Sequence, residues 1–144
     1  MKAINQIRLS FLSRSVNEGF ARMAVAAFAA QLDPTVEEIS EIKTAISEAV
    51  TNCIVHGYGD TLGNVIIQGR IYEDGKLVVS VKDKGRGIAD VPQAMEPLFT
   101  TGDEAERSGM GFTIMETFMD KLKVSSKPGI GTTVTLTKYI RAKG

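Results

Sequence analysis

The sequence contains very few of the residues that build disulfides or metal centres. Its 144 residues include one cysteine, one histidine and no tryptophan. A single cysteine excludes an internal disulfide, and one cysteine with one histidine is too few for a zinc site. A chain of this length can bury roughly 70% of its unfolded surface, so it needs no such cross-link to fold. We therefore expect a globular protein of a reducing compartment.

The sequence also lacks an excess of charge of either sign, and it lacks a long apolar run. Seventeen Lys and Arg residues balance seventeen Asp and Glu residues, which argues against a general binder of nucleic acid or of membrane surfaces. The longest uncharged apolar stretch, at 23–32, is about half as long as a membrane span. The first residues contain no apolar segment of a signal peptide. These absences predict a cytoplasmic protein that contacts neither membranes nor nucleic acid directly.

Hydrophobic patterns predict groups of strands and helices in a definite order. Apolar residues at alternate positions predict strands at 7–11, 65–72, 76–82, 121–126 and 132–139. Helices are expected after capping boxes at 15–18 and 35–38, and again at 112–118. Strands joined by hairpins predict a mixed, largely antiparallel sheet with helices on one face, an α/β two-layer sandwich. No linker divides the chain, so residues 1–144 are expected to form a single domain.

Each of the two long helices is expected to bury one apolar face. The 3.6-residue period of the first helix selects Val16, Phe20, Met23, Ala24, Ala27 and Phe28. The period of the second helix selects Ile39, Ile42, Ile46, Ala49, Val50 and Cys53. The second stripe leaves Glu48 and Asn52 on a different face of their helix.

Glu48 and Asn52 form the first candidate for chemistry. Four residues correspond to about 400° of helical rotation, so the two side chains lie about 40° apart. The carboxylate can take up a proton, and the amide oxygen one turn later can ligate Mg²⁺. The alternative is a solvated acidic face, because Glu37 and Glu41 lie on the same helix.

The glycine-rich segments in the second half of the chain form the other candidates. Asp83 ends an apolar strand and is followed by Gly85 and Gly87. A carboxylate there can accept a hydrogen bond from an exocyclic amine, and glycine lets a ligand approach the backbone. The alternative is an ordinary turn, in which Asp and Gly are common.

Gly109 and Gly111 open the predicted helix at 112–118. Backbone amides at a helix N-terminus form an anion site suited to phosphate, although a hinge before the helix explains the same residues. The spacing fits neither a Walker loop nor a dinucleotide fingerprint. Gly131 and Thr132 lie at the start of the last predicted strand, where a hairpin is the simpler explanation.

Taken together, these motifs are far more specific than any one of them. Glu-x-x-x-Asn, Asp-x-Gly-x-Gly, Gly-x-Gly and Gly-x-Gly-Thr follow one another over about eighty residues, in the order that resembles the GHKL family. That family groups the ATP sites of gyrase, Hsp90, histidine kinases and MutL. The segment 46–58 and the short lid at 97–108 are most similar to the branch of anti-sigma factors with serine kinase activity in endospore-forming bacteria. The resemblance implies a Bergerat-type ATP-binding fold.

The resemblance also implies roles for individual residues in transferring the γ-phosphoryl group of MgATP to a protein serine. Glu48 would orient or deprotonate the serine hydroxyl, and Asn52 would supply an oxygen to Mg²⁺. Asp83, supported by Thr132, would accept a hydrogen bond from the adenine amine. Arg107, at the end of the lid, would place a cation on the terminal phosphate. The glycines would bring the backbone to the nucleotide and its phosphates: Gly85, Gly87, Gly109 and Gly111.

The partners expected from the resemblance are proteins. The ATP-bound form would sequester a sigma factor of the sigma F type, an anti-anti-sigma protein would be the phosphorylated substrate, and the chain would be a homodimer. The first helix, which carries Arg22, is a candidate contact surface. Three other functions stay open: an ATP-dependent binding module without transfer, an ATP hydrolase in which Glu48 activates water, and a stand-alone histidine-kinase catalytic domain.

Overall fold

In the computed structural model, which describes residues 2–96 and 111–140, the strands form one antiparallel sheet. The strands are β1 (Asn5–Leu12), β2 (Asn64–Ile71), β3 (Lys76–Asp83), β4 (Lys121–Lys127) and β5 (Gly131–Tyr139). Their order across the sheet is β1-β2-β3-β5-β4, and each neighbouring pair is antiparallel. The hairpins predicted between β2 and β3 and between β4 and β5 are confirmed.

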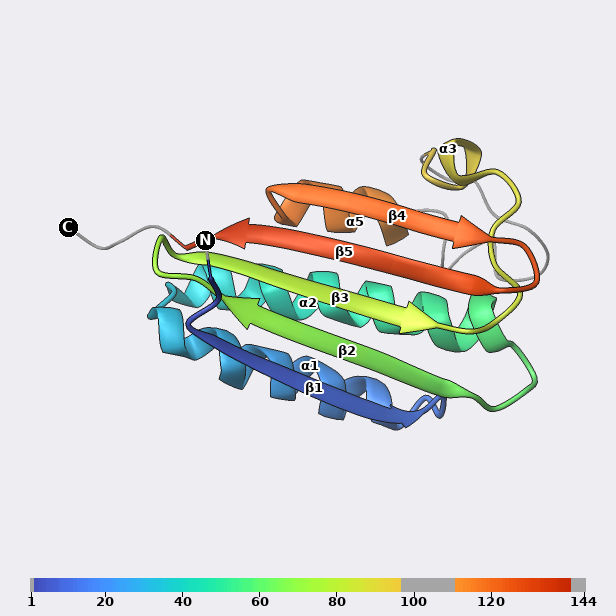
Figure 1. Ribbon diagram of the computed structural model, residues 1–144, viewed down its shortest axis with the longest axis horizontal. Helices are drawn as coiled ribbons and strands as arrows, with labels where there is room; N and C mark the ends of the chain where they lie inside the picture. The colour runs from blue at the N-terminus through green and yellow to red at the C-terminus, as the bar shows by residue number, and fades with distance from the viewer. Residues whose placement is uncertain (1, 97–110, 141–144) are drawn as a thin grey trace.

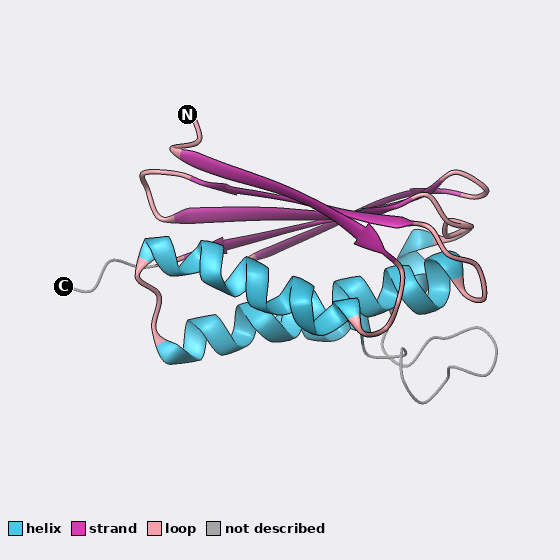
Figure 2. Cartoon of the chain, turned by 90° about the horizontal axis from the view of Figure 1, so that it is seen from below, coloured by secondary structure: helices cyan, strands magenta, loops and turns pink. Residues whose placement is uncertain are grey.

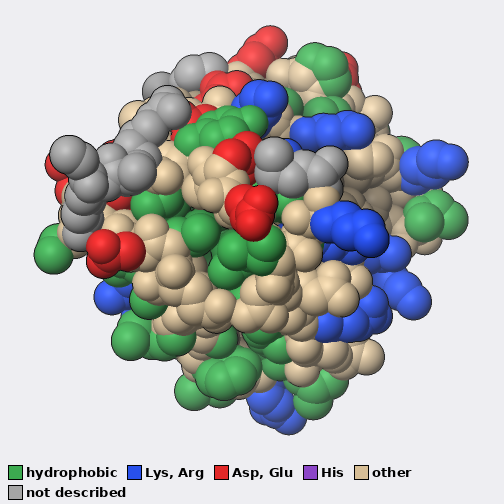
Figure 3. Space-filling view, turned by 60° about the vertical axis from the view of Figure 1, so that its left-hand side comes forward, with side chains coloured by type: hydrophobic (Ala, Val, Ile, Leu, Met, Phe, Trp, Pro, Cys, Tyr) green, Lys and Arg blue, Asp and Glu red, His purple; other side chains and the backbone are tan. Residues whose placement is uncertain are grey.

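The long helices cover one face of this sheet (Figures 1 and 2). They are α1 (Asn17–Ala29), α2 (Val36–Asn52) and α5 (Gly111–Phe118), and the short helix α3 (Val91–Ala94) follows β3. The opposite face of the sheet carries exposed basic side chains, such as Arg8, Arg70 and Lys123, and Lys and Arg gather on one side of the molecule in Figure 3. A sheet with one covered and one charged face is the predicted two-layer sandwich.

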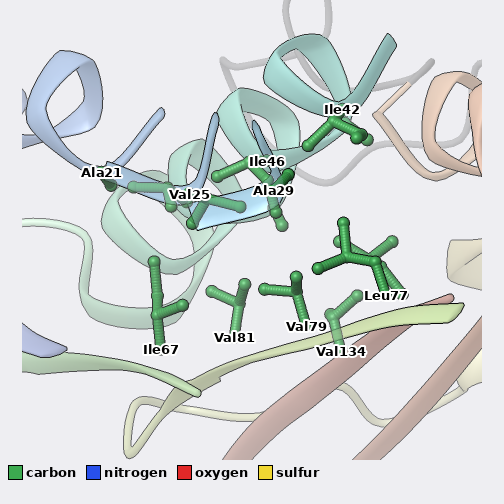
Figure 4. Packing of buried hydrophobic residues seen from close by; sticks show 14 of the residues in the cluster. Ala21, Val25, Ala29, Ile42, Ile46, Ile67, Leu77, Val79, Val81 and Val134 are labelled. Atoms are coloured by element: carbon green, nitrogen blue, oxygen red, sulfur yellow. The ribbon is translucent and has the colours of Figure 1, made fainter. Parts of the chain in front are cut away.

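The core lies between α1, α2 and the inner face of the sheet. Val65, Ile67, Val79 and Val81 alternate along β2 and β3 and are fully buried. Figure 4 shows side chains of the two helices pointing toward those of the sheet. Because the strand period of two puts all these residues on one face, the sheet offers the helices a continuous apolar surface.

Helix α2 forms as its sequence predicts. Thr35 is the N-cap: its hydroxyl oxygen accepts a hydrogen bond from the Glu38 backbone N–H at 3.0 Å, and the Glu38 carboxylate accepts one from the Thr35 N–H at 2.8 Å. Ile42, Ile46 and the other predicted stripe residues are buried, apart from half-buried Ile39. The helix continues as a π-helix, Cys53–Tyr58, which the sequence did not predict.

The capping box of α2 leads to a stability prediction. We expect Thr35→Ala to lower the free energy of unfolding by about 1 kcal/mol, because the N3 amide loses its side-chain acceptor. Thr44→Ala is the matched control in the same helix, where the hydroxyl donates to the Ser40 carbonyl and alanine has the higher helix propensity. Urea titrations of both variants measure the difference. Equal losses for the two variants would contradict the capping role.

Two predictions for α1 are wrong. No side-chain cap forms at its start, where Val16 is the N-cap. Instead of closing a capping box, the Glu18 carboxylate accepts a hydrogen bond from the Ser47 hydroxyl at 2.7 Å and lies 3.5 Å from the Arg22 guanidinium. Because the Glu18 side chain contacts Ser47 of α2, it does not close the predicted capping box.

The buried face of α1 also differs from the prediction. Its buried residues are Ala21, Val25, Ala26, Phe28 and Ala29, whereas Val16, Phe20 and Met23 are 78%, 57% and 55% exposed. Of the predicted face, Phe28 alone is buried. The helix is apolar on more than one side, and the face with small residues packs against α2 because alanines let two helices approach closely. We call Val16, Phe20 and Met23 the α1 outer face.

Candidate nucleotide-binding site

A cavity of about 300 Å³ opens between α2, the end of β3 and α5, and it collects residues from motifs that are far apart in the sequence. Asn52, Cys53, Asp83, Gly87, Phe112 and Thr132 contribute to its lining. This volume is at the lower end of the range for small-molecule sites. Asn52, Asp83, Gly87 and Thr132 are thus brought together as predicted.

Asp83 lies at the last position of β3 and is 4% exposed. Its carboxylate accepts a hydrogen bond from the Gly85 N–H at 2.9 Å. Burial raises the pKa of the Asp83 carboxyl above its usual value, and the polar groups of Gly85, Cys53 and Thr132 beside it offset part of that rise. A buried carboxylate held at a cavity wall can accept a hydrogen bond from a ligand amine.

The glycine motif after Asp83 has a packing reason as well as a ligand-binding one. A Cβ on Gly85 would lie 2.1 Å from the Gly57 carbonyl oxygen, and a Cβ on Gly57 would lie 2.8 Å from the Asp83 carboxylate carbon. The Arg86 N–H donates to the Gly57 carbonyl at 3.0 Å. Gly87, at φ +74°, lines the cavity. The close contact of the π-helix with the loop after β3 thus depends on two residues without side chains.

The predicted pair Glu48 and Asn52 meets the start of α5. A Cβ on Gly111 would lie 3.4 Å from the Asn52 side-chain amide atoms and 3.4 Å from Glu48 Oε1. Glu48 is half-buried, and burial, together with the negative charge of Glu18, raises the pKa of its carboxyl. Glu48 is therefore not part of a solvated acidic face, and its carboxylate is a better proton acceptor than an exposed glutamate.

Thr132 is held by a side chain that the sequence did not single out. Its hydroxyl oxygen lies 2.7 Å from Ser126 Oγ. Ser126 Oγ also donates to the Gly131 carbonyl at 3.0 Å and accepts from the Ile88 N–H at 2.7 Å. The serine thereby connects the loop after Asp83 to the start of β5. Ser126 had no distinguishing sequence signal, because polar residues are common at strand ends.

Two further residues at this site were not predicted. Cys53 belongs to the predicted apolar stripe of α2, and Gly57 has no predicted role. Cys53 and Gly57 are small residues one helical turn apart. This spacing becomes informative only once the structure shows that β3 ends against them.

The residues present fit a magnesium ion held together with nucleotide phosphates. Among residues 2–96 and 111–140, no cluster of three or more His, Cys, Asp or Glu side chains could hold a metal ion. Asn52 presents an oxygen donor at the cavity wall, and magnesium is commonly bound by one or two protein oxygens plus substrate phosphates.

Two of the predicted site residues, Arg107 and Gly109, lie outside the described residues together with the lid at 97–108. Their roles stay predictions. Within the described part of the chain, no helix has the length and apolar character needed to cross a membrane.

Comparison with known proteins agrees with this geometry. The family of histidine kinase-like ATPase domains matches residues 11–138. The RsbU and RsbW domains of a Mycobacterium tuberculosis protein share the fold, with a TM-score of 0.69 over 94% of this chain and 32% of that one, at 21% identity. A blue-light activated histidine kinase domain from Erythrobacter litoralis matches with a TM-score of 0.55 and 20% identity, covering 85% of this chain and 61% of that one. Fold and site thus define a nucleotide-binding domain of the histidine kinase-like ATPase class.

Curated relatives narrow this class. The chain is 59% identical over 140 residues to the anti-sigma F factor of Thermoanaerobacter sp. (strain X514), with 97% of each chain covered. It is 56% identical to the anti-sigma F factor of Halalkalibacterium halodurans, covering 94% of this chain and 93% of that one. The chain therefore belongs to the anti-sigma F factor family within the histidine kinase-like ATPases.

Proposed function

We propose that the chain, acting as one domain, is an ATP-dependent protein-serine kinase that also binds a sigma factor of the sigma F type. The observation that carries the kinase proposal is that Asn52, which lines the cavity together with Asp83, lies beside Gly111 at the start of α5, as does Glu48. Adenine recognition and phosphate chemistry would then occupy one continuous site. The relatives' name, anti-sigma F factor, supports the sigma factor as partner.

In this mechanism Asp83 binds the purine. Its buried carboxylate accepts a hydrogen bond from the 6-amino group of adenine, and guanine, which carries a carbonyl oxygen there, is disfavoured. Thr132 supports Asp83 as its paired residue on the neighbouring strand β5. Gly87 keeps this wall free of side chains, and Gly85 lets the loop after β3 pack on Gly57. Gly111 and Gly109 would donate amides to the phosphates.

Glu48 acts on the protein substrate. As the serine Oγ attacks the γ-phosphorus, the bond to the β,γ-bridging oxygen breaks and ADP leaves, and the serine proton passes to the Glu48 carboxylate. Asn52 and the phosphates would hold Mg²⁺, which supplies positive charge to the leaving oxygen. Arg107 would act on the same terminal phosphate.

The partner proposal is tested with labelled nucleotide. We expect the chain to transfer label from γ-labelled ATP to a serine of an anti-anti-sigma protein, and to retain a sigma F type factor on a column when ATP is present. Phosphoserine survives acid, whereas phosphohistidine does not, so acid treatment separates a serine kinase from a histidine kinase. Nucleotide binding without transfer would leave an ATP-dependent binding module, and release of free phosphate alone would indicate a hydrolase.

We also propose that a second copy of this chain covers the α1 outer face. Three large apolar side chains, Val16, Phe20 and Met23, are exposed along one helix. The Phe20 ring packs edge-on against Phe11 of the edge strand β1, with the ring centroids 6.4 Å apart. An exposed apolar patch of this kind is typical of an interaction surface.

The dimer proposal predicts a change in oligomeric state. We expect Phe20→Glu or Met23→Glu to convert a dimer into a monomer, because a desolvated carboxylate is costly at an apolar interface. Light scattering coupled to size exclusion measures the mass. Ile130→Glu is the control, since Ile130 is 67% exposed in the turn between β4 and β5. A dimer that persists in both α1 variants would refute this surface.

A further inference from the structure

Ser126 is a half-buried residue of β4 that does not itself line the nucleotide cavity, yet it hydrogen-bonds to two residues that do. Its hydroxyl accepts from the Ile88 N–H at 2.7 Å, donates to the Gly131 carbonyl at 3.0 Å, and lies 2.7 Å from the Thr132 hydroxyl oxygen. Ile88 and Thr132 belong to the cavity wall. The mechanism proposed above gives Ser126 no role in binding.

The number of hydroxyl protons fixes the direction of the hydrogen bond between Ser126 and Thr132. Ser126 has one such proton, and the bond to the Gly131 carbonyl uses it. The 2.7 Å contact between the two hydroxyls is then a hydrogen bond only if Thr132 is the donor. Ser126 Oγ accordingly accepts two hydrogen bonds and donates one, which is its full capacity. Because the Thr132 proton is used in this way, its hydroxyl oxygen can only accept from a ligand.

The Thr132 hydroxyl belongs to the same part of the cavity wall as the carboxylate of Asp83. The two residues are direct partners in the antiparallel pair of β3 and β5, and both line the cavity. Side chains of such partners leave the same face of the sheet, with Cβ atoms about 4.5–5.5 Å apart. The wall therefore presents two neighbouring acceptors, which suit a ligand group with two N–H donors, such as an exocyclic amine, and disfavour a carbonyl oxygen.

We propose that Ser126 is a positioning residue for base specificity, which takes up the Thr132 proton and so keeps that hydroxyl an acceptor for the 6-amino group of the purine. This inference rests on the proposed recognition of adenine by Asp83. Ser126 lies behind the cavity wall and acts through Thr132. Without Ser126, the Thr132 hydroxyl can turn its proton toward the cavity and donate it to a 6-oxo group. Loss of Ser126 therefore changes the choice between purines.

The test measures selectivity between ATP and inosine 5′-triphosphate, which carries a 6-oxo group in place of the 6-amino group. Both nucleotides are titrated with Mg²⁺ into the wild type and Ser126→Ala by calorimetry. We expect the preference for ATP, the ratio of the two dissociation constants, to fall about three- to tenfold in Ser126→Ala, the effect of one hydrogen bond. Ser125→Ala is the matched control, because Ser125 is exposed on the opposite face of β4, and it should keep the wild-type ratio.

A second background tests whether Ser126 acts through Thr132. Thr132→Val keeps the shape of the side chain but removes the hydroxyl, so it should lower the preference for ATP by itself. Ser126→Ala added to Thr132→Val should then change the ratio no further, because the two residues act as one unit. Ser126→Cys fills the same space with a weaker acceptor for the Thr132 proton and should give an intermediate ratio, which keeps the test decisive if Ser126→Ala does not fold.

The outcomes separate this inference from the proposed function. Wild-type protein that prefers ATP, with the preference lost in Asp83→Asn, supports adenine recognition by Asp83. On that background, an unchanged ratio in Ser126→Ala, including an equal loss of affinity for both nucleotides, overturns the role of Ser126 and leaves that of Asp83 intact. A further fall of the ratio when Ser126→Ala is added to Thr132→Val overturns it as well. Wild-type protein that binds both nucleotides equally overturns the recognition by Asp83 and with it this inference.

Discussion

Glu48→Gln is expected to slow phosphoryl transfer to the protein substrate by about 10²- to 10⁴-fold, the usual contribution of a general base. Glutamine has nearly the same size as glutamate but cannot take up the serine proton. ATP binding should persist, because Glu48 adjoins the phosphate end of the site and is not among the residues that line the purine cavity. Transfer is measured with γ-labelled ATP, and binding by calorimetry.

The control for Glu48 comes from the same helix. Glu37 is an exposed carboxylate in the first turn of α2, so Glu37→Gln removes one negative charge and should leave the transfer rate unchanged. Transfer at the wild-type rate in Glu48→Gln would end the assignment of Glu48 as the base.

The raised pKa of Glu48 adds a pH dependence to this prediction. A general base works when it is deprotonated, so the rate falls as the pH decreases through its pKa. Because burial and Glu18 raise that pKa, the acidic limb of the rate profile should lie above the usual range of a glutamate. Glu18→Gln should move the limb to lower pH, since it removes a negative charge beside the base.

The second large effect is expected at Asp83. Asp83→Asn should weaken ATP binding by about 10- to 100-fold, because a hydrogen bond to a charged group contributes about 1.5–3 kcal/mol. The amide oxygen of asparagine would accept from the Gly85 N–H, as Asp83 Oδ1 does, which turns its NH₂ group toward the adenine amine. Calorimetric titration of ATP with Mg²⁺ measures the loss.

Asp90 provides the control for this substitution. Asp90 also lines the cavity, but its carboxylate caps α3 by accepting from the Gln93 N–H at 3.1 Å. Asparagine is an equally good cap, so Asp90→Asn should bind ATP as the wild type does. Binding of ATP to Asp83→Asn with wild-type affinity would contradict adenine recognition by Asp83.

Loss of ATP binding in Asp83→Asn should not come from unfolding. The pKa of Asp83 is raised in the folded protein, so folding disfavours its charged form, and the carboxylate lowers stability as the pH rises through the interval between its unfolded and folded pKa values. A neutral side chain of the same shape removes that cost. The free energy of unfolding of the variant at pH 7 should therefore equal or exceed that of the wild type.

Most of the strands and one long helix could be predicted from local sequence, because their patterns have one physical solution. In α2 the capping box and a single apolar stripe agree, and in β2 and β3 the alternation allows only one buried face. In α1 neither condition holds. Apolar side chains lie on more than one side of α1, so two faces of the helix fit the period of 3.6 residues. Packing against α2 and the sheet buries the face that carries the alanines. Glu18 likewise binds Ser47 of α2 rather than its own helix start.

The sequence by itself determined the order of the motifs and the chemical types that meet at the site: a carboxylate and an amide on one helix, an aspartate at a strand end, and glycines near each of them. Only the tertiary structure decided what surrounds these groups. Cys53, Asp83 and Thr132 come from three separate segments to line one cavity, and Gly57 and Ser126 contact residues far away in the chain. Hydrogen bonding and burial depend on distance in space, and the packing of helices on the sheet, not the spacing of residues, brings those atoms together.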